Sequence, residues 1–188
     1  MTVQDDVKHL ENVFRLKEVY RFSQVQERKE SSAEHSWSCL VVADILLNYV
    51  KQPINRLRVY ELLTYHDLVE VEAGDVGAFS GHGKEEKLRQ EQEAAHTLAK
   101  RLPPSIAQKF LVCFTEYTEE KTREARFAHL VDGIEADAFY GMYPPKKAVV
   151  SAEEYDRKRA KHLKAFPEIK PIYDEIKRLR IKEGIIIE

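Results

Sequence analysis

Residues 62 to 70 read Leu62-Leu63-Thr64-Tyr65-His66-Asp67-Leu68-Val69-Glu70, so an apolar run ends in an imidazole and two carboxylates. Upstream, Val59 begins the i, i+3, i+4, i+7 spacing of an amphipathic helix, which places His66 on the buried side. An imidazole nitrogen and a carboxylate oxygen on adjacent residues can reach one divalent ion from a single rigid element. The stretch therefore predicts half of a metal site, formed by His66 and Asp67.

A second imidazole stands at the start of an earlier helix. Ser31 is followed three residues later by Glu34, a capping-box pattern that predicts a helix running to about Val50. Its apolar residues cover nearly the whole circumference, so we expect a central helix with His35 facing inward and Trp37 filling the core.

The rest of the chain also has a helical pattern. Beyond the two helices above, we expect helices at about residues 5–19, 84–101, 105–117, 123–143, 151–165 and 167–180. Residues 24–30 form a polar connector, residues 71–83 a glycine-rich loop, and no segment shows strand alternation. The predicted fold is an all-α, single-domain helical bundle of residues 1–145, with a helical extension, residues 146–188, packed on the same domain.

Composition limits the partners and the compartment. The net charge of -2 over 188 residues creates no field for a polyanion, so no nucleic-acid partner is expected. Cys39 and Cys113 lie among apolar residues, as reduced core cysteines do. No signal-peptide pattern and no run of membrane-spanning length occurs, so we expect a cytoplasmic protein with no membrane partner.

The metal site needs a further carboxylate ligand beside His35, His66 and Asp67. The helix at 123–143 offers Asp132, which lies off its main apolar stripe, and Asp137, which lies beside that stripe; periodicity leaves both open. Two imidazoles and two carboxylates suit one divalent Mn, Co, Fe, Ni or Zn ion better than calcium.

Four spaced motifs carry a resemblance to a known family. They are Lys29-Glu30-Ser31-Ser32-Ala33-Glu34-His35-Ser36, His66-Asp67-Leu68-Val69-Glu70, Gly74-Asp75 and Leu130-Val131-Asp132-Gly133-Ile134-Glu135. Over roughly residues 8–140 the chain resembles the HD-domain metal-dependent phosphohydrolases, most closely their 5'-deoxynucleotidase branch. The resemblance implies an HD-domain helical bundle, a homodimer, a nucleoside 5'-monophosphate substrate, and one divalent cation on His35, His66, Asp67 and Asp132.

The same resemblance implies the catalytic residues, Glu70 and Asp75, beside the attacking water. Physical chemistry is consistent with this role for Glu70, because it lies one turn after His66 and can accept a hydrogen bond from a water whose pKa a metal lowers toward about 7. The family also places the loop that begins at the Gly-Asp pair against the nucleotide, which here is Asp75, Val76, Gly77 and Ala78.

Two basic residues are the nearest candidates for holding the phosphate. Arg21 precedes the first histidine helix, and Lys84 follows the glycine-rich loop. Bacterial deoxynucleotidases of the family contact substrate through an Arg-Trp pair, whereas this chain has Tyr20-Arg21-Phe22.

Two other functions use the same metal site. One is a phosphodiesterase of cyclic nucleotides, or a hydrolase of alarmones or nucleoside triphosphates. The other is a metal- and nucleotide-binding protein without catalytic activity. The monophosphatase-like motifs, with Glu70 and Asp75 present, favour the 5'-deoxynucleotidase.

Overall fold

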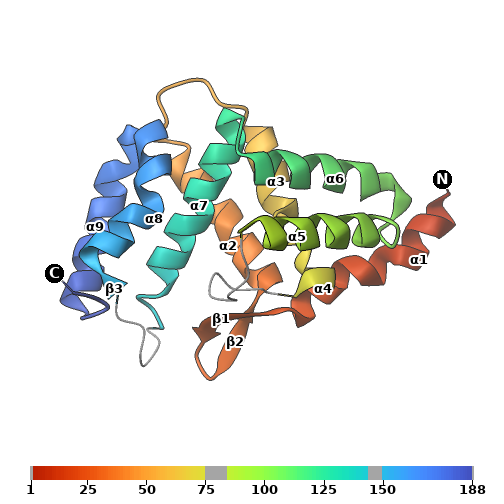
Figure 1. Cartoon of the computed structure of the whole chain (residues 1–188), viewed down its shortest axis with the longest axis horizontal. Helices are drawn as coiled ribbons and strands as arrows, with labels where there is room; N and C mark the ends of the chain where they lie inside the picture. The colour runs from red at the N-terminus through yellow and green to blue at the C-terminus, as the bar shows by residue number, and fades with distance from the viewer. Residues whose placement is uncertain (1, 75–83, 144–149, 188) are drawn as a thin grey trace.

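The computed structural model describes residues 2–74, 84–143 and 150–187. The helices are α1 (Val3–Phe14), α2 (Ser32–Leu46), α3 (Arg56–Tyr65), α4 (Glu70–Ala73), α5 (Lys84–Ala99), α6 (Pro104–Glu119), α7 (Arg123–Phe139), α8 (Ala152–Ala165) and α9 (Lys170–Lys182), with 3-10 helices η1 (Arg15–Glu18) and η2 (Pro167–Ile169). Short strands are β1 (Tyr20–Val25), β2 (Arg28–Ser31), β3 (Val150–Ser151) and β4 (Ile186–Ile187). The predicted all-α class is confirmed, and Figure 1 shows the helices stacked along the long axis of the molecule, with the termini at opposite ends.

The prediction that no segment forms a strand is wrong at two places. β1 and β2 form an antiparallel hairpin across the predicted polar connector, and Gln26 turns the chain with a φ of 55°. β2 contains only polar residues, and the apolar alternation of β1 is limited to Tyr20-Arg21-Phe22-Ser23, too short to stand out in the sequence. β3 and β4 pair in parallel over two residues each, which is too short for any periodic signal.

Helix α2 begins as its sequence predicts. The Ser31 hydroxyl accepts from the Glu34 backbone N–H at 3.3 Å, and the Glu34 carboxylate accepts from the Ser31 N–H at 2.9 Å. His35 is fully buried. The helix ends at Leu46 rather than near Val50. The prediction that Trp37 fills the core is wrong: its side chain is 67% exposed, because the other helices cover one side of α2 and Trp37 lies on the other.

The described residues form three apolar clusters, and the His66-Asp67 pair lies in the chain between the two larger ones. Leu62 and Leu63 at the end of α3 belong to the cluster between α2, α3 and α7. Leu68 and Val69, just after the pair, belong to a second cluster with residues of η1, α5 and α6. The chain thus passes from one cluster to the other at His66 and Asp67, just after α3 ends. Both side chains are held in place by the packed residues before and after them.

The C-terminal helices are tied to the same core. Phe166 and Ile169 lie in the main cluster, and Arg159 of α8 forms an ion pair with Asp137 of α7 at 2.9 Å. The Arg159 guanidinium also lies so close to Gly133 that a Cβ there would meet it at 2.5 Å. The predicted boundary at residue 145 stays a prediction. No helix among the described residues has the length and apolar character needed to cross a bilayer.

Candidate metal centre

Three elements bring the four predicted ligands together. His35 comes from the first turn of α2, His66 and Asp67 from the turn that follows α3, and Asp132 from the middle of α7. His35 Nε2 lies 3.1 Å from Asp132 Oδ1 and 3.8 Å from Asp67 Oδ2, while His66 Nε2 lies 3.3 Å from Asp67 Oδ1. The structure thus places two imidazoles and two carboxylates around one point.

The second nitrogen of each imidazole is already engaged. His35 Nδ1 lies 2.7 Å from the Glu135 carboxylate, and His66 Nδ1 lies 2.8 Å from the Leu63 carbonyl oxygen. Because a carbonyl only accepts, Nδ1 carries the proton of a neutral His66 and its Nε2 keeps the lone pair. Metal-ligating histidines are oriented in this way, with the second ring nitrogen donating to a carboxylate or carbonyl.

Among the described residues, His66 Nε2 is the buried polar atom of this site that lacks a hydrogen bond. It is buried and has no hydrogen-bond partner among the residues that the structure describes. Leaving a buried polar atom unpaired costs about 1–3 kcal/mol. A divalent cation would remove this cost, and the nitrogen and oxygen donors around the point suit a transition metal, so these residues fit the ion that the sequence predicts.

Asp132 carries the negative charge that a cation requires. Burial opposes the charge of Asp132, but its hydrogen bond with His35 and the nearby positive groups hold the pKa of this carboxyl well below its ordinary value. Tyr117 donates to its other oxygen at 3.0 Å. Of the two aspartates that periodicity left open, the structure thus brings Asp132 to His35, whereas Asp137 pairs with Arg159.

Neighbouring carboxylates also change the pKa of His35. Burial alone would lower its pKa, but hydrogen bonds with Asp132, Cys39 and Glu135 outweigh burial and raise the pKa of His35 well above its ordinary value. The pocket thus attracts positive charge. Cys39 Sγ lies 3.4 Å from His35 Nε2, and it shares with His35, His66 and Asp132 a group of ligand-type atoms within 4.8 Å of one another. Burial raises the pKa of this thiol to about 12.

Sequence reasoning missed three residues of this site. Glu135 orients His35, Tyr117 holds Asp132, and Ser32 donates to Glu70 Oε2 at 2.5 Å. Glu135 could have been found, because it follows Asp132 by three residues and so shares its face of α7. Tyr117 and Ser32 reach the site through packing of helices distant in sequence, which no local pattern reveals.

Arg21 reaches the site from the hairpin. Its guanidinium donates to Asp67 Oδ2 at 2.9 Å, and its Nε lies 3.7 Å from the buried Glu30. Burial raises the pKa of Glu30, and the Ser23 hydroxyl donates to it at 2.5 Å. The hairpin, which the sequence patterns did not predict, thus places Arg21, the candidate for holding the phosphate, beside the predicted ligand Asp67.

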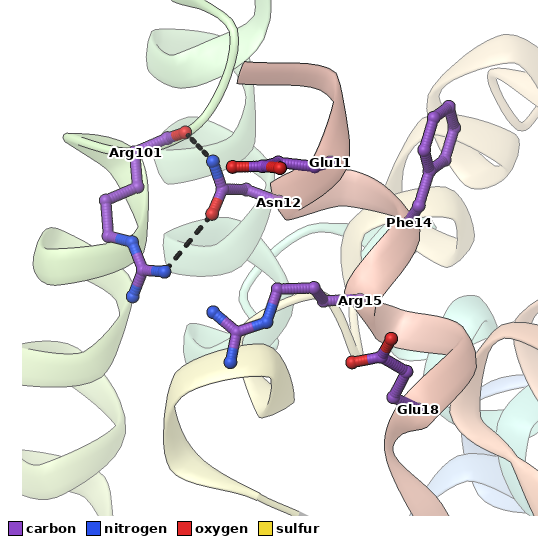
Figure 2. A pocket seen from close by; sticks show the side chains of 6 residues that line it. All are labelled: Glu11, Asn12, Phe14, Arg15, Glu18 and Arg101. Carbon is purple, nitrogen blue, oxygen red and sulfur yellow. Dashed lines mark hydrogen bonds between the residues drawn. The ribbon is translucent and has the colours of Figure 1, made fainter. Parts of the chain in front are cut away.

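The remaining predicted residues are less fully described. Asp75, Val76, Gly77 and Ala78 lie outside the described residues, and Lys84 is described only as the first residue of α5. A cavity of about 400 Å³ lies elsewhere, beside α1, and none of the predicted site residues lines it (Figure 2). It is lined by Glu11, Asn12, Phe14, Arg15, Glu18 and Arg101. Its charges are mixed, and Arg101 is engaged with Asn12 and Glu72.

Comparison with known proteins identifies the family of the chain. The sequence profile of the HD domain matches residues 13–170. The 5'-deoxynucleotidase HDDC2 of Homo sapiens is 30% identical over 129 residues, which cover 69% of this chain and 60% of that protein. The 5'-deoxynucleotidase hdd1 of Schizosaccharomyces pombe is 32% identical over 124 residues, which cover 64% and 61%. The match thus spans about six-tenths of the length of these curated relatives.

Among solved structures, the fold is similar to that of a predicted metal-dependent phosphohydrolase from Magnetospirillum magnetotacticum MS-1. The two chains are 23% identical with a TM-score of 0.76, and the match covers 99% of this chain and 98% of the other. This likeness concerns the fold, whereas the profile match covers most of the sequence. The chain therefore belongs to the HD-domain family.

Proposed function

We propose that this protein is a metal-dependent phosphohydrolase that removes the 5'-phosphate from deoxyribonucleoside 5'-monophosphates, as a cytoplasmic homodimer. The observation that carries the proposal is the buried His66 Nε2, which has no hydrogen-bond partner among the described residues and lies beside His35, Asp67 and Asp132. The choice of substrate is supported by two relatives that are named 5'-deoxynucleotidases.

In this proposal His35, His66, Asp67 and Asp132 hold one divalent cation, either Mn, Co, Fe, Ni or Zn, with Mn and Co as the first to test. When bound, such an ion polarises phosphoryl oxygens and lowers the pKa of a coordinated water toward about 7. Tyr117 and Glu135 are the positioning residues for this set, since each binds a ligand side chain on the side away from the centre.

Glu70 is the proposed proton acceptor for the attacking water. Its carboxylate is held by Ser32 across 38 residues of sequence, and it lies at the start of α4, one turn beyond His66. In hydrolysis, the water oxygen forms a bond to phosphorus, the bond from phosphorus to the 5'-oxygen breaks, and the proton lost by water is returned to that 5'-oxygen. Glu70 is suited to carry this proton, with Asp75 as the second proposed catalytic residue.

Arg21 is the proposed phosphate contact. Its ion pair with Asp67 places the guanidinium beside the ligand set, and a guanidinium is the side-chain group best suited to recognise phosphoryl oxygens. Asp75, Val76, Gly77, Ala78 and Lys84 are proposed to contact the rest of the nucleotide on the basis of the family resemblance.

The test is phosphate release from purified protein whose metal content is measured. With Mn or Co bound, we expect release from deoxyribonucleoside 5'-monophosphates and weaker release from ribonucleotides. Metal-loaded protein that releases no phosphate from any monophosphate would contradict the proposal. Cleavage of cyclic nucleotides, alarmones or triphosphates in the same panel would instead identify a different substrate for the same site.

A further inference from the structure

Helix α2 exposes an apolar stripe on the side opposite to His35. Trp37 is 67% exposed, Val41 45% and Ile45 54%, and Tyr49, just beyond the helix, is 52% exposed. The first three are spaced by four residues, so they form one continuous row along the helix. We call these four residues the α2 stripe.

A helix that is apolar all round is normally buried on every side. The inner side of α2 meets this expectation, because Cys39, Ala43 and Leu46 are buried in the main core. The outer side is exposed to solvent, although it carries Trp37, Val41 and Ile45. Exposed Trp is rare outside binding surfaces and is enriched at the energetic centres of protein interfaces. The composition of α2 therefore indicates that another surface covers the stripe.

We infer that the α2 stripe is the interface of a homodimer, in which α2 packs antiparallel against α2 of a second copy about a twofold axis at Val41. This inference rests on the proposed function in one respect only, which is that the protein is a homodimer. Because Val41 is midway between Trp37 and Ile45, a twofold axis there places Trp37 against Ile45 of the partner subunit, and the reverse. The stripe is thus complementary to itself, as a twofold interface must be.

The helix dipoles of α2 suit the same arrangement. Antiparallel packing places the positive N-terminal end of each α2 beside the negative C-terminal end of its partner, which is favourable. The acidic residue in the first turn, Glu34, is already neutralised within its own subunit by an ion pair with Arg28 at 2.5 Å.

The apolar area is of the size that a stable dimer requires. With about 150–250 Å² for a fully exposed large side chain, the exposed fractions of the stripe give on the order of 400 Å² per subunit. A standard interface covers about 800 Å² per partner, of which a little over half is apolar. The stripe therefore supplies the apolar centre, and its polar neighbours supply the rim.

Light scattering coupled to gel filtration tests the inference on the full chain. The parent should elute at twice the chain mass of 21.9 kDa, and Val41→Lys should elute as a monomer. Val112→Lys is the matched control, because Val112 is 47% exposed on α6, and it should remain a dimer. A monomeric parent, or a dimeric Val41→Lys protein with native circular dichroism, would overturn the inference.

Cross-linking provides a second test that does not depend on destabilising anything. Helix axes in contact lie about 8–10 Å apart and each Cα lies about 2.3 Å from its axis, so facing Cα atoms at the twofold axis approach about 4–5 Å. This is within reach of a disulfide. The native cysteines are buried and should not interfere. Under mild oxidation, Val41→Cys should form a covalent dimer and Val112→Cys should not; equal cross-linking of both, or of neither, would overturn the inference.

The outcome is separable from that of the proposed chemistry. A dimer through α2 that releases no phosphate would leave this inference standing while removing the nucleotidase. An active protein whose Val41→Cys variant stays monomeric under oxidation would support the nucleotidase and overturn the α2 interface.

Discussion

Two clusters of histidine and carboxylate lie on either side of Tyr117, and they differ in kind. The inner cluster is the candidate metal centre of His35, His66, Asp67 and Asp132. The outer cluster consists of Glu120, His129 and His162, whose ligand-type atoms lie within 4.8 Å of one another, as do those of His35, Cys39, His66 and Asp132 in the inner one. Tyr117 donates to Asp132 on one side and stacks on His129 at 3.8 Å on the other. By composition alone, either cluster could bind a metal.

Each residue of the outer cluster has a hydrogen-bond partner in the protein. Glu120 accepts from Lys161 at 2.6 Å and lies 2.9 Å from His162 Nε2, and His129 Nε2 lies 3.0 Å from the Tyr117 carbonyl oxygen. The rings of His129 and His162 are parallel within 4°, with centroids 5.6 Å apart. In the inner cluster, by contrast, the buried His66 Nε2 has no hydrogen-bond partner in the part of the chain that the structure describes. The comparison teaches that unsatisfied, converging donors indicate a metal site, whereas residue types alone do not.

The largest expected effect separates the two clusters directly. His66→Ala should lose stoichiometric metal and reduce phosphate release by about three orders of magnitude, or about 4 kcal/mol, because a ligand and its orientation are both removed. His162→Ala should keep both within a few-fold. Metal analysis by mass spectrometry and a phosphate assay provide the measurements. If His162→Ala lost its metal and His66→Ala kept it, the comparison would be reversed.

The next effect distinguishes chemistry from binding within the inner cluster. Glu70→Gln should keep its metal but release phosphate about 10²- to 10⁴-fold more slowly, the usual contribution of a positioned acid or base. Asp75→Asn is the companion variant for the second proposed catalytic residue. Full activity in Glu70→Gln would remove Glu70 from the mechanism. Nucleotide binding without turnover in both parent and variant would identify a binding protein instead.

A smaller effect concerns residues that position the ligands. Glu135→Gln should weaken metal affinity by about 10- to 100-fold, because its hydrogen bond to His35 Nδ1 loses its charge. Tyr117→Phe, which leaves one Asp132 oxygen without its donor, should act in the same direction. Titration with a competing chelator measures the affinity, and Glu120→Gln serves as the control from the outer cluster. Unchanged affinity in Glu135→Gln would show that packing alone orients His35.

Sequence patterns predicted the helices because capping and periodicity are local. The Ser31–Glu34 capping box and the apolar spacing before His66 both appear in the structure. What failed depends on contacts distant in sequence. Trp37 was expected in the core because the pattern of α2 cannot show which side other helices cover. The hairpin was missed because β2 has no apolar residue and the alternation in β1 is short, although the hairpin brings Arg21 to Asp67.

The residues of the candidate site also fall into those that local patterns predict and those that depend on contacts distant in sequence. His35, His66 and Asp67 followed from helix faces, whereas the choice of Asp132 over Asp137 needed the family resemblance and agrees with the geometry. Ser32, Tyr117 and the satisfied state of the outer cluster depend on partners between 12 and 42 residues away in sequence, as in the bonds of His129 and His162. Local patterns therefore locate donors, and tertiary packing determines which donors remain available.

The smallest expected effect is a pH-dependent stability of the outer cluster. Burial opposes the charge of Glu120, but Lys161 and His162 outweigh it and hold the pKa of this carboxyl at about 2, below its ordinary value of 4.5. A carboxyl whose pKa is lower in the folded state contributes stability above about pH 4.5 and loses it as the pH falls toward 2. Urea unfolding should therefore show Glu120→Gln to be less stable than the parent at pH 7, by about 1 kcal/mol after solvent screening. The gap should shrink at pH 3, whereas Glu119→Gln, beside it on the surface, should show no gap at either pH. A gap that stayed constant with pH would mean that Glu120 contributes through packing and not through its charge.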